Sequence, residues 1–143
     1  MTADPRVHEI TLRVRYGETD KMGVVYHANH FLYFESGRTE YLRRLGVAYR
    51  DLEARGVALV VVDCGARYRG NVGYDDLLTV RTRVTSLARV RIRFDYEVLL
   101  DGRLLVEGHT TLACLDGQGK PRELPEEVSG RLAGLVIPKA EVR

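Results

Sequence analysis

The sequence predicts an α+β protein in which a curved antiparallel sheet of about five strands wraps around one long helix. A single amphipathic run at helical spacing, residues 30–45, follows one strand pattern and precedes four more. Short turns join most of the later strands, and short turns place neighbouring strands antiparallel. The helix has one strong apolar stripe, and a sheet that curves around it buries that stripe together with its own apolar face.

The length and composition indicate a single domain over residues 1–143. The chain is 45% hydrophobic and 29% charged, with a formal net charge of only +2. That charge is too small to indicate nucleic-acid binding, although it permits a local basic patch that meets a small anion. No apolar run approaches the length that spans a membrane, and the N-terminus lacks the apolar segment of a signal peptide. We therefore expect a cytoplasmic protein with Cys64 and Cys114 as buried, reduced thiols.

Two periodicities define the first strand and the long helix. Residues 7–16 alternate apolar and polar side chains, as a half-buried strand does. Over residues 30–45 the spacing places five apolar side chains on one side of a helix: Phe31, Phe34, Tyr41, Leu42 and Leu45. Gly46 is expected to end this helix. Glu35 and Arg38, at i and i+3, are expected to form an ion pair; alternatively, Glu35 orients a water molecule near Asp20.

Period-two patterns over residues 58–70, 77–88, 90–102 and 103–120 predict the four further strands. The first of them is expected to hold five side chains on its inward face: Val60, Val62, Cys64, Ala66 and Tyr68. The next two strands are expected to point Val80, Thr82, Val84, Val90, Ile92, Phe94, Tyr96 and Val98 inward. Asp101-Gly102 is typical of a hairpin turn. Residues 47–56 favour a short helix or an irregular segment, and residues 125–135 a short closing helix.

A candidate reaction site lies where the first strand passes into the helix, in the stretch YGETDKMGVVYHANHFLYFESGRTEYLRRL, residues 16–45. Asp20 lies in the loop that leads into the helix, and Gly23 follows three residues later. An aspartate is ionised at neutral pH and can attack a carbonyl carbon directly, or it can accept a proton from water. The same Asp in front of a helix is also typical of a simple N-cap.

Backbone groups are the expected partners for negative charge that develops on a substrate oxygen. No Lys or Arg lies between Gly23 and Arg38, and Lys21 is a flexible side chain before the helix. The first N–H groups of a helix have no internal acceptor and lie at the positive end of its dipole. We therefore expect a carbonyl oxygen to dock on the amide of His27 or a near neighbour. A direct role for the His27 ring is the alternative.

The motif Y-x-x-T-D-x-x-G-V-V-Y-H, starting at Tyr16, is followed by F-x-x-F-E-x-x-R-x-E-x-L, starting at Phe31. This string, in its strand–loop–helix context, resembles the hotdog-fold acyl-CoA thioesterases. It is most similar to the 4-hydroxybenzoyl-CoA thioesterase and YbgC-type branch. The resemblance covers nearly the whole chain and implies hydrolysis of an acyl-CoA to a carboxylic acid and free CoA.

The resemblance also implies a site and an assembly. Asp20 matches the catalytic carboxylate, as nucleophile or general base, and the amide at His27 matches the group that polarises the thioester carbonyl. The substrate-binding candidates are Tyr16, Gly23, Val24, Tyr26 and Phe34. Two subunits are implied to pair edge to edge, as a homodimer or within a homotetramer, with the site at their interface. No cofactor is implied, because CoA is part of the substrate, and acyl carrier protein is a possible partner.

Contacts to the CoA phosphates are expected from arginines on the later strands, because an Arg fork suits phosphate. The candidates are Arg67, Arg69 and Arg91. The chain departs from the family pattern at His30, where relatives commonly have an aromatic residue, and at Asn71, where they often have proline. The first departure bears on the acyl pocket and the second on the nucleotide arm.

Other functions remain open from the sequence. A non-catalytic binder of acyl thioesters uses the same pocket, although the intact Asp20 argues against it. A hydratase or dehydratase of the same fold places an Asp and a His differently. His27 and His30 at i and i+3 suggest a metal pair, but no third ligand has suitable spacing, so no metal is expected. Asp63 is a second carboxylate, expected on the less buried face of its strand.

Overall fold

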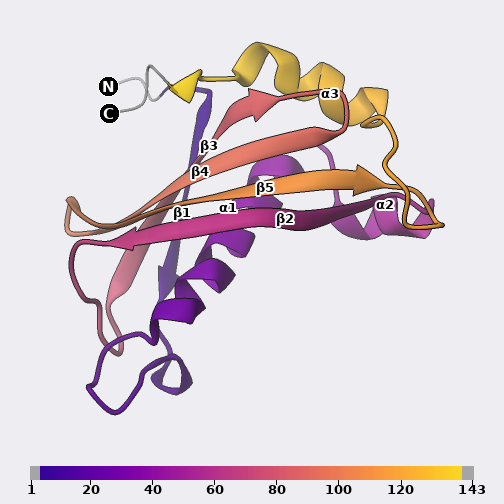
Figure 1. The fold of residues 1–143 in the computed structure, drawn as a ribbon. Helices are drawn as coiled ribbons and strands as arrows, with labels where there is room; N and C mark the ends of the chain where they lie inside the picture. Colours follow the sequence, from indigo (N-terminus) through magenta and orange to yellow (C-terminus); the bar gives the residue numbers. More distant parts are fainter. Residues whose placement is uncertain (1–3, 140–143) are drawn as a thin grey trace.

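The computed structural model describes residues 4–139, and its helices and strands follow the predicted order (Figure 1). The strands are β1 (Val7–Arg13), β2 (Ala58–Tyr68), β3 (Leu77–Leu87), β4 (Arg91–Leu100) and β5 (Arg103–Leu115). The helices are α1 (His30–Arg44), α2 (Tyr49–Ala54) and α3 (Glu126–Leu132), with short 3-10 turns η1 (Tyr16–Glu18), η2 (His27–Asn29) and η3 (Ala133–Leu135). The predicted short helices after α1 and near the C-terminus are thereby confirmed.

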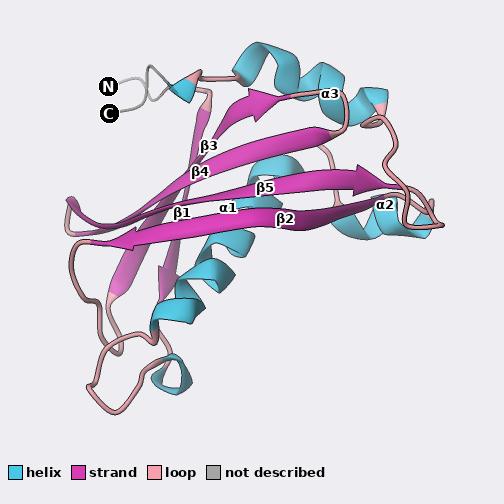
Figure 2. Ribbon diagram, in the orientation of Figure 1, coloured by secondary structure: helices cyan, strands magenta, loops and turns pink. Residues whose placement is uncertain are grey.

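All five strands form one antiparallel sheet in the order β1-β3-β4-β5-β2. The sheet curves around α1, which lies against one face, while α2 and α3 lie toward the ends of the strands (Figure 2). This arrangement confirms the predicted α+β class and the number of strands. Within residues 4–139 no helix is long and apolar enough to cross a membrane.

The core lies between α1 and the inner face of the sheet. Phe34 is fully buried and stacks on Tyr96 of β4, with ring centroids 4.5 Å apart. A Cβ at Gly108 of β5 would lie 2.3 Å from the Phe34 ring, so only glycine permits this approach of helix and sheet. Seven predicted inward residues of β3 and β4 are buried, which confirms their alternation: Val80, Thr82, Val84, Ile92, Phe94, Tyr96 and Val98. Val90, also predicted to point inward, precedes β4 and is only partly buried.

The predicted facing of β2 is wrong in one half of the strand, because a register shift falls between Val61 and Asp63 in its pairing with β5. Paired residues on neighbouring antiparallel strands point to the same side of the sheet. Val61 pairs with the buried Leu112, so the preceding Val60 points to the outer face, whereas Cys64 pairs with Thr110 on the inner face. One extra residue in a strand reverses the alternation beyond it.

Strand β2 is also more exposed than its sequence predicts. Val60, Val61 and Val62 are exposed although all are apolar, because β2 is an edge strand with no neighbour beyond it among the described residues. The same edge position exposes Cys64. Cys64 is a free thiol, as predicted, but the prediction that it is buried is wrong. Cys114, on the interior strand β5, is buried as expected.

Turns and helix ends agree with the predictions from glycine. Gly46 has φ of +85° directly after α1, and Asp101 and Gly102, with φ of +50° and +80°, form the β4–β5 hairpin turn. The expected pair on the helix is present, since Arg38 Nη2 lies 3.9 Å from Glu35 Oε2. These elements fix the orientation of α1, and with it the loop that enters the helix.

Candidate active site

The loop between β1 and α1 is folded by its own backbone rather than extended. The Asp20 N–H donates to Val24 O at 2.9 Å, and the Gly23 N–H donates to Asp20 O at 2.9 Å. Gly23 has φ of +80°, a conformation that favours glycine, and this closes the turn. The Val25 N–H donates to Val72 O at 2.8 Å, which ties the loop to the β2–β3 connection. The loop lies below the sheet at the N-terminal end of α1 (Figure 1).

Glu18 holds this loop against α1 through five hydrogen bonds. Its carboxylate accepts from the Arg15 N–H at 2.9 Å, from Arg15 Nε at 3.1 Å and from the Tyr33 hydroxyl at 2.9 Å. Its carbonyl accepts from the Tyr26 N–H at 3.0 Å and from Asn29 Nδ2 at 2.9 Å. Burial alone would raise the pKa of Glu18, but these hydrogen bonds to the carboxylate lower it overall. The carboxylate is therefore ionised and orders the loop.

Asp20 lies in the turn with a largely free carboxylate. Its Oδ1 accepts from the Met22 N–H at 2.9 Å, and no described residue donates to Oδ2. Asp20 lies in the loop that leads into the helix, as predicted, but residues 21–26 separate it from η2, with Val25 bridging to Thr19 and Val24 to Gly73. Asp20 therefore does not cap the helix, and one face of its carboxylate is available to a ligand.

Two backbone amides at the start of the helical run have no acceptor. The first internal bond of η2 is from Asn29 N–H to Tyr26 O at 2.8 Å, and no described residue accepts from the N–H of His27 or Ala28. The Tyr68 hydroxyl donates to His27 O at 2.9 Å and so anchors this turn to the end of β2. Free N–H groups thus occur at the predicted residue, His27, and at its neighbour.

Aromatic rings and imidazoles surround this turn. The His27 ring lies 4.6 Å from the Tyr26 ring and 6.1 Å from the Tyr68 ring. His30, only 3% exposed, lies 5.6 Å from Tyr68 and 5.3 Å from Tyr33. Burial, assisted by the nearby His27, lowers the pKa of His30 to about 4. His30 is therefore neutral at neutral pH, and the turn offers one buried and one exposed imidazole.

The structure brings together most of the predicted substrate-binding residues, but not all of them. Gly23, Val24 and Tyr26 belong to the folded loop, and Tyr26 is 48% exposed. Tyr16 is 77% exposed and contacts the Tyr74 ring edge-on at 5.6 Å. Phe34 lies in the core under Tyr96, with no exposed surface in the single chain.

Glu18, Tyr33 and Tyr68 are site residues that the sequence reasoning missed. Glu18 occupies an unspecified position of the Y-x-x-T-D motif, so the motif did not single it out. Tyr33 falls on the buried stripe of α1, three residues from His30, and its hydroxyl needs a partner there. Tyr68 gave no usable signal, because it contacts the turn from 41 residues away in the chain.

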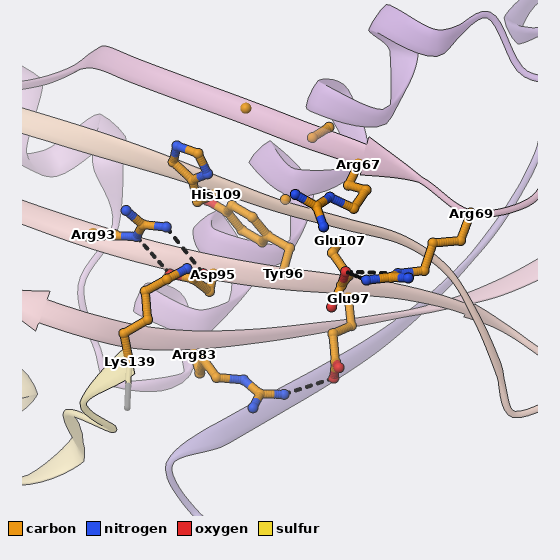
Figure 3. Close-up of a pocket in the computed structure, with 13 residues that line it drawn as sticks. Arg67, Arg69, Arg83, Arg93, Asp95, Tyr96, Glu97, Glu107, His109 and Lys139 are labelled. Carbon is orange, nitrogen blue, oxygen red and sulfur yellow. Dashed lines mark hydrogen bonds and ion pairs between the residues drawn. The ribbon is translucent and has the colours of Figure 1, made fainter. Parts of the chain in front are cut away.

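A separate cavity of about 600 Å³ lies on the outer face of the sheet, away from α1 (Figure 3). Arg67 and Arg69 of the predicted phosphate contacts line it, whereas Arg91 does not. Arg69 pairs with Glu107 at 2.7 Å, and Arg67 has no ion-pair partner among residues 4–139. Half-buried pairs cover its floor: Arg83 with Glu97 at 2.8 Å and Arg93 with Asp95 at 2.9 Å.

The remaining titratable candidates make structural pairs. Asp63 is exposed on the outer face, as predicted, and its Oδ2 lies 3.1 Å from His109 Nε2. Over residues 4–139 no group of three His, Cys, Asp or Glu side chains lies together as a metal site. His27 and His30 gain no third ligand in the described part of the chain.

Known proteins resemble this chain over most of its length. A model of the Thioesterase-like superfamily matches residues 14–132. Acyl-CoA thioesterase YbgC of Haemophilus influenzae is 38% identical over 119 residues, which cover 82% of this chain and 88% of the relative. The structure of hypothetical protein TT1821 from Thermus thermophilus superposes with a TM-score of 0.85 at 37% identity, covering 89% of this chain and 98% of that one. The DHNA-CoA thioesterase of Staphylococcus aureus does so with a TM-score of 0.83 at 32% identity, covering 90% and 87%.

Proposed function

Because the chain belongs to the thioesterase-like superfamily, as a YbgC-type thioester hydrolase with the hotdog fold, we propose that it hydrolyses an acyl-CoA. The products are a carboxylic acid and free CoA. One observation carries the site: a single folded loop presents a largely free carboxylate, Asp20, and leads to two amides without acceptors, those of His27 and Ala28.

Asp20 acts on the thioester carbon in one of two ways. As a nucleophile, an Asp20 oxygen bonds to the carbon, the C–S bond breaks, CoA leaves as a thiolate that takes up a proton, and water then hydrolyses the resulting anhydride. As a general base, Asp20 accepts a proton from the water that attacks the same carbon; the C–S bond then breaks, and the leaving CoA thiolate takes up that proton. The single hydrogen bond to its carboxylate, from Met22, supports either role, because Oδ2 is left without a protein donor.

The amides of His27 and Ala28 stabilise the oxyanion in both routes. Attack places negative charge on the thioester oxygen, and fixed N–H donors reduce the energy of that state more than the energy of the ground state. The Tyr68 hydroxyl and the Glu18 carbonyl support this assignment, because they hold the turn from both sides through His27 O and the Tyr26 N–H. The donors are therefore ordered before the substrate binds.

CoA phosphates are assigned to the outer-face cavity at the end of β2. Among the arginines that line this cavity, Arg67 alone has no ion-pair partner in residues 4–139, and it lies next to Tyr68 on β2. Arg69 is available to a phosphate if its pair with Glu107 rearranges. Arg91 lies outside this cavity, and we therefore rank it below the other two.

A second copy of the chain is expected to complete the site. The edge strand β2 exposes Val60, Val61 and Val62, and an exposed apolar edge favours pairing with another strand. Two β2 edges that pair would give one continuous sheet and cover this surface. Light scattering at micromolar concentration should therefore show a dimer or a tetramer, and an active monomer would contradict the assignment.

The test of the function is release of free CoA thiol from a panel of aromatic, short aliphatic and longer acyl-CoAs, with acyl carrier protein thioesters included. Asp20→Asn keeps the size and the turn but removes the charge, so kcat should fall by about two to four decades. Glu40→Gln, a change to an exposed carboxylate near the C-terminal end of α1, should leave kcat unchanged. Binding of acyl-CoAs without thiol release by the wild-type protein would identify a non-catalytic binder instead.

A further inference from the structure

His30 carries a polar atom that nothing in the described structure satisfies. Its Nδ1 is enclosed and makes no hydrogen bond, although the side chain lies at the first residue of α1 beside the proposed oxyanion amides. Buried polar atoms nearly always have partners, and leaving one without a partner costs about 1–3 kcal/mol. A buried imidazole that makes no hydrogen bond to the described residues therefore directs attention to its second nitrogen, Nε2.

Only one of the two imidazole nitrogens is fully enclosed. Nε2 also lacks a partner among residues 4–139, but, unlike Nδ1, it is not fully enclosed. An orphaned buried N–H is rarer than an under-satisfied acceptor, so the favoured tautomer keeps Nδ1 as a lone pair and carries hydrogen on Nε2. Burial lowers the pKa of His30, so the imidazole is neutral at neutral pH and its N–H donor carries no charge. His30 thus offers a single neutral N–H at the edge of the site.

The ring is held in place by its neighbours, which makes that donor directional. Tyr33 contacts it edge-on at 5.3 Å, and the Tyr33 hydroxyl is itself fixed by Glu18 at 2.9 Å. Tyr68, at the end of β2, contacts the His30 ring with ring centroids 5.6 Å apart. Tyr68 is 42% exposed, so this side of the His30 ring lies close to solvent. The His27 ring also contacts Tyr68, with ring centroids 6.1 Å apart, so both imidazoles border the same tyrosine.

We propose that His30 is a specificity-determining residue, and that its Nε2–H donates a hydrogen bond to an oxygen substituent on the acyl group. This inference rests on the proposed function and names the substrate class: acyl-CoAs that carry a hydroxyl or oxo group. A site with a buried donor discriminates strongly against an analogue that lacks the matching oxygen, because the donor is then left unpaired. A phenylalanine of similar shape would remove this discrimination without leaving an empty space.

The test compares matched pairs of substrates: benzoyl-CoA with its 2-, 3- and 4-hydroxy derivatives, and butyryl-CoA with 3-hydroxybutyryl-CoA. For the wild-type protein, kcat/KM should favour at least one oxygenated member by 10-fold or more. His30→Phe should reduce that ratio by about 10-fold to 100-fold. His30→Gln, whose amide nitrogen occupies nearly the place of Nε2, should retain part of the preference. Melting temperature should show both variants folded, because removal of an unsatisfied polar atom need not destabilise.

His8 provides the matched control. It also contacts a tyrosine edge-on, Tyr41 at 6.3 Å, but near the C-terminal end of α1. His8→Phe should leave the substrate ratio unchanged. A ratio that His30→Phe does not alter, or an equal loss on every acyl-CoA, overturns the proposal and leaves the thioesterase function intact. Failure of the wild-type protein to hydrolyse any acyl-CoA overturns both.

Discussion

The two ends of α1 treat their polar groups in opposite ways. At the C-terminal end the backbone is satisfied: the Gly46 N–H donates to Arg43 O at 2.9 Å and the Val47 N–H to Leu42 O at 2.9 Å. Arg131 Nη1 also donates to Leu45 O at 2.8 Å. At the N-terminal end the amides of His27 and Ala28 and the Nδ1 atom of His30 have no partner in residues 4–139.

The difference separates stability from function within one helix. Leu42 and Tyr41 at the C-terminal end are fully buried, so that end fixes α1 in the core. Unpartnered groups at the other end lower stability, and a protein retains such groups where a ligand binds. The two amides are open to a ligand oxygen, whereas at His30 the enclosed Nδ1 stays a lone pair and Nε2–H is the group proposed to meet the ligand. The comparison predicts that changes at the N-terminal end alter catalysis, whereas changes at the C-terminal end alter unfolding.

Among changes at the two ends of the helix, the largest catalytic effect is expected from His27→Pro, which removes one proposed oxyanion donor. Tyr26, the preceding residue, has φ of −59° and ψ of 129°, the extended conformation that a following proline requires. Proline is also tolerated at the start of a helix, because the missing N–H has no internal acceptor there. We expect kcat to fall by about 100-fold to 1,000-fold, as for loss of an oxyanion donor, with an unchanged melting temperature. Unchanged kcat would remove the His27 amide from the mechanism.

The largest effect on stability is expected at the other end of the helix. Leu42→Ala leaves a cavity at a fully buried position, so the free energy of unfolding should fall by about 2–5 kcal/mol in denaturant titrations. Well below the melting temperature, kcat should match that of the wild-type protein. A fall in kcat comparable to that of His27→Pro would show that the two ends are not separable.

A smaller catalytic effect is expected from Glu18, which positions the loop without contacting the reacting atoms. Glu18→Gln weakens the bonds from Arg15 and keeps an acceptor for Tyr33, so kcat should fall about 10-fold while KM changes little. Adding Tyr33→Phe to Glu18→Gln should lower kcat by less than the product of the two single effects, because both residues share one hydrogen bond. Glu40→Gln breaks the exposed pair with Arg43 near the C-terminal end and serves as the control, with kcat unchanged. Equal losses in both Glu variants would contradict a positioning role.

Much of this division could be read from the sequence, because it follows local periodicity. Helical spacing predicted the buried face of α1 through Phe34, Tyr41 and Leu42, and Gly46 marked its end. The bulge in β2 could not be predicted in this way, since the position of one extra residue is decided by pairing with β5. The exposure of Cys64 follows from the edge position of β2, which is a property of the whole sheet.

The candidate site was predicted only in its local parts. Asp20 and the His27 amide lie in one motif, and the structure places them in one folded loop. The bonds that order this loop join residues far apart in the chain, such as Glu18 with Tyr33 and Tyr68 with His27. Sequence spacing does not specify such contacts. The missing partner of His30 Nδ1 is likewise visible only when all of its neighbours are known.

The smallest effect is expected from His27→Ala, and it isolates the amide from the ring. The His27 ring is exposed and makes no hydrogen bond within residues 4–139, contacting only Tyr26 and Tyr68. Alanine keeps the N–H, keeps the carbonyl that accepts from Tyr68, and favours the helical conformation. We therefore expect kcat within about 3-fold of the wild-type value, far above that of His27→Pro, in the same thiol-release assay. If His27→Ala is as inactive as Asp20→Asn, the ring itself participates in the reaction, and the oxyanion site must be reassigned from the backbone to the imidazole.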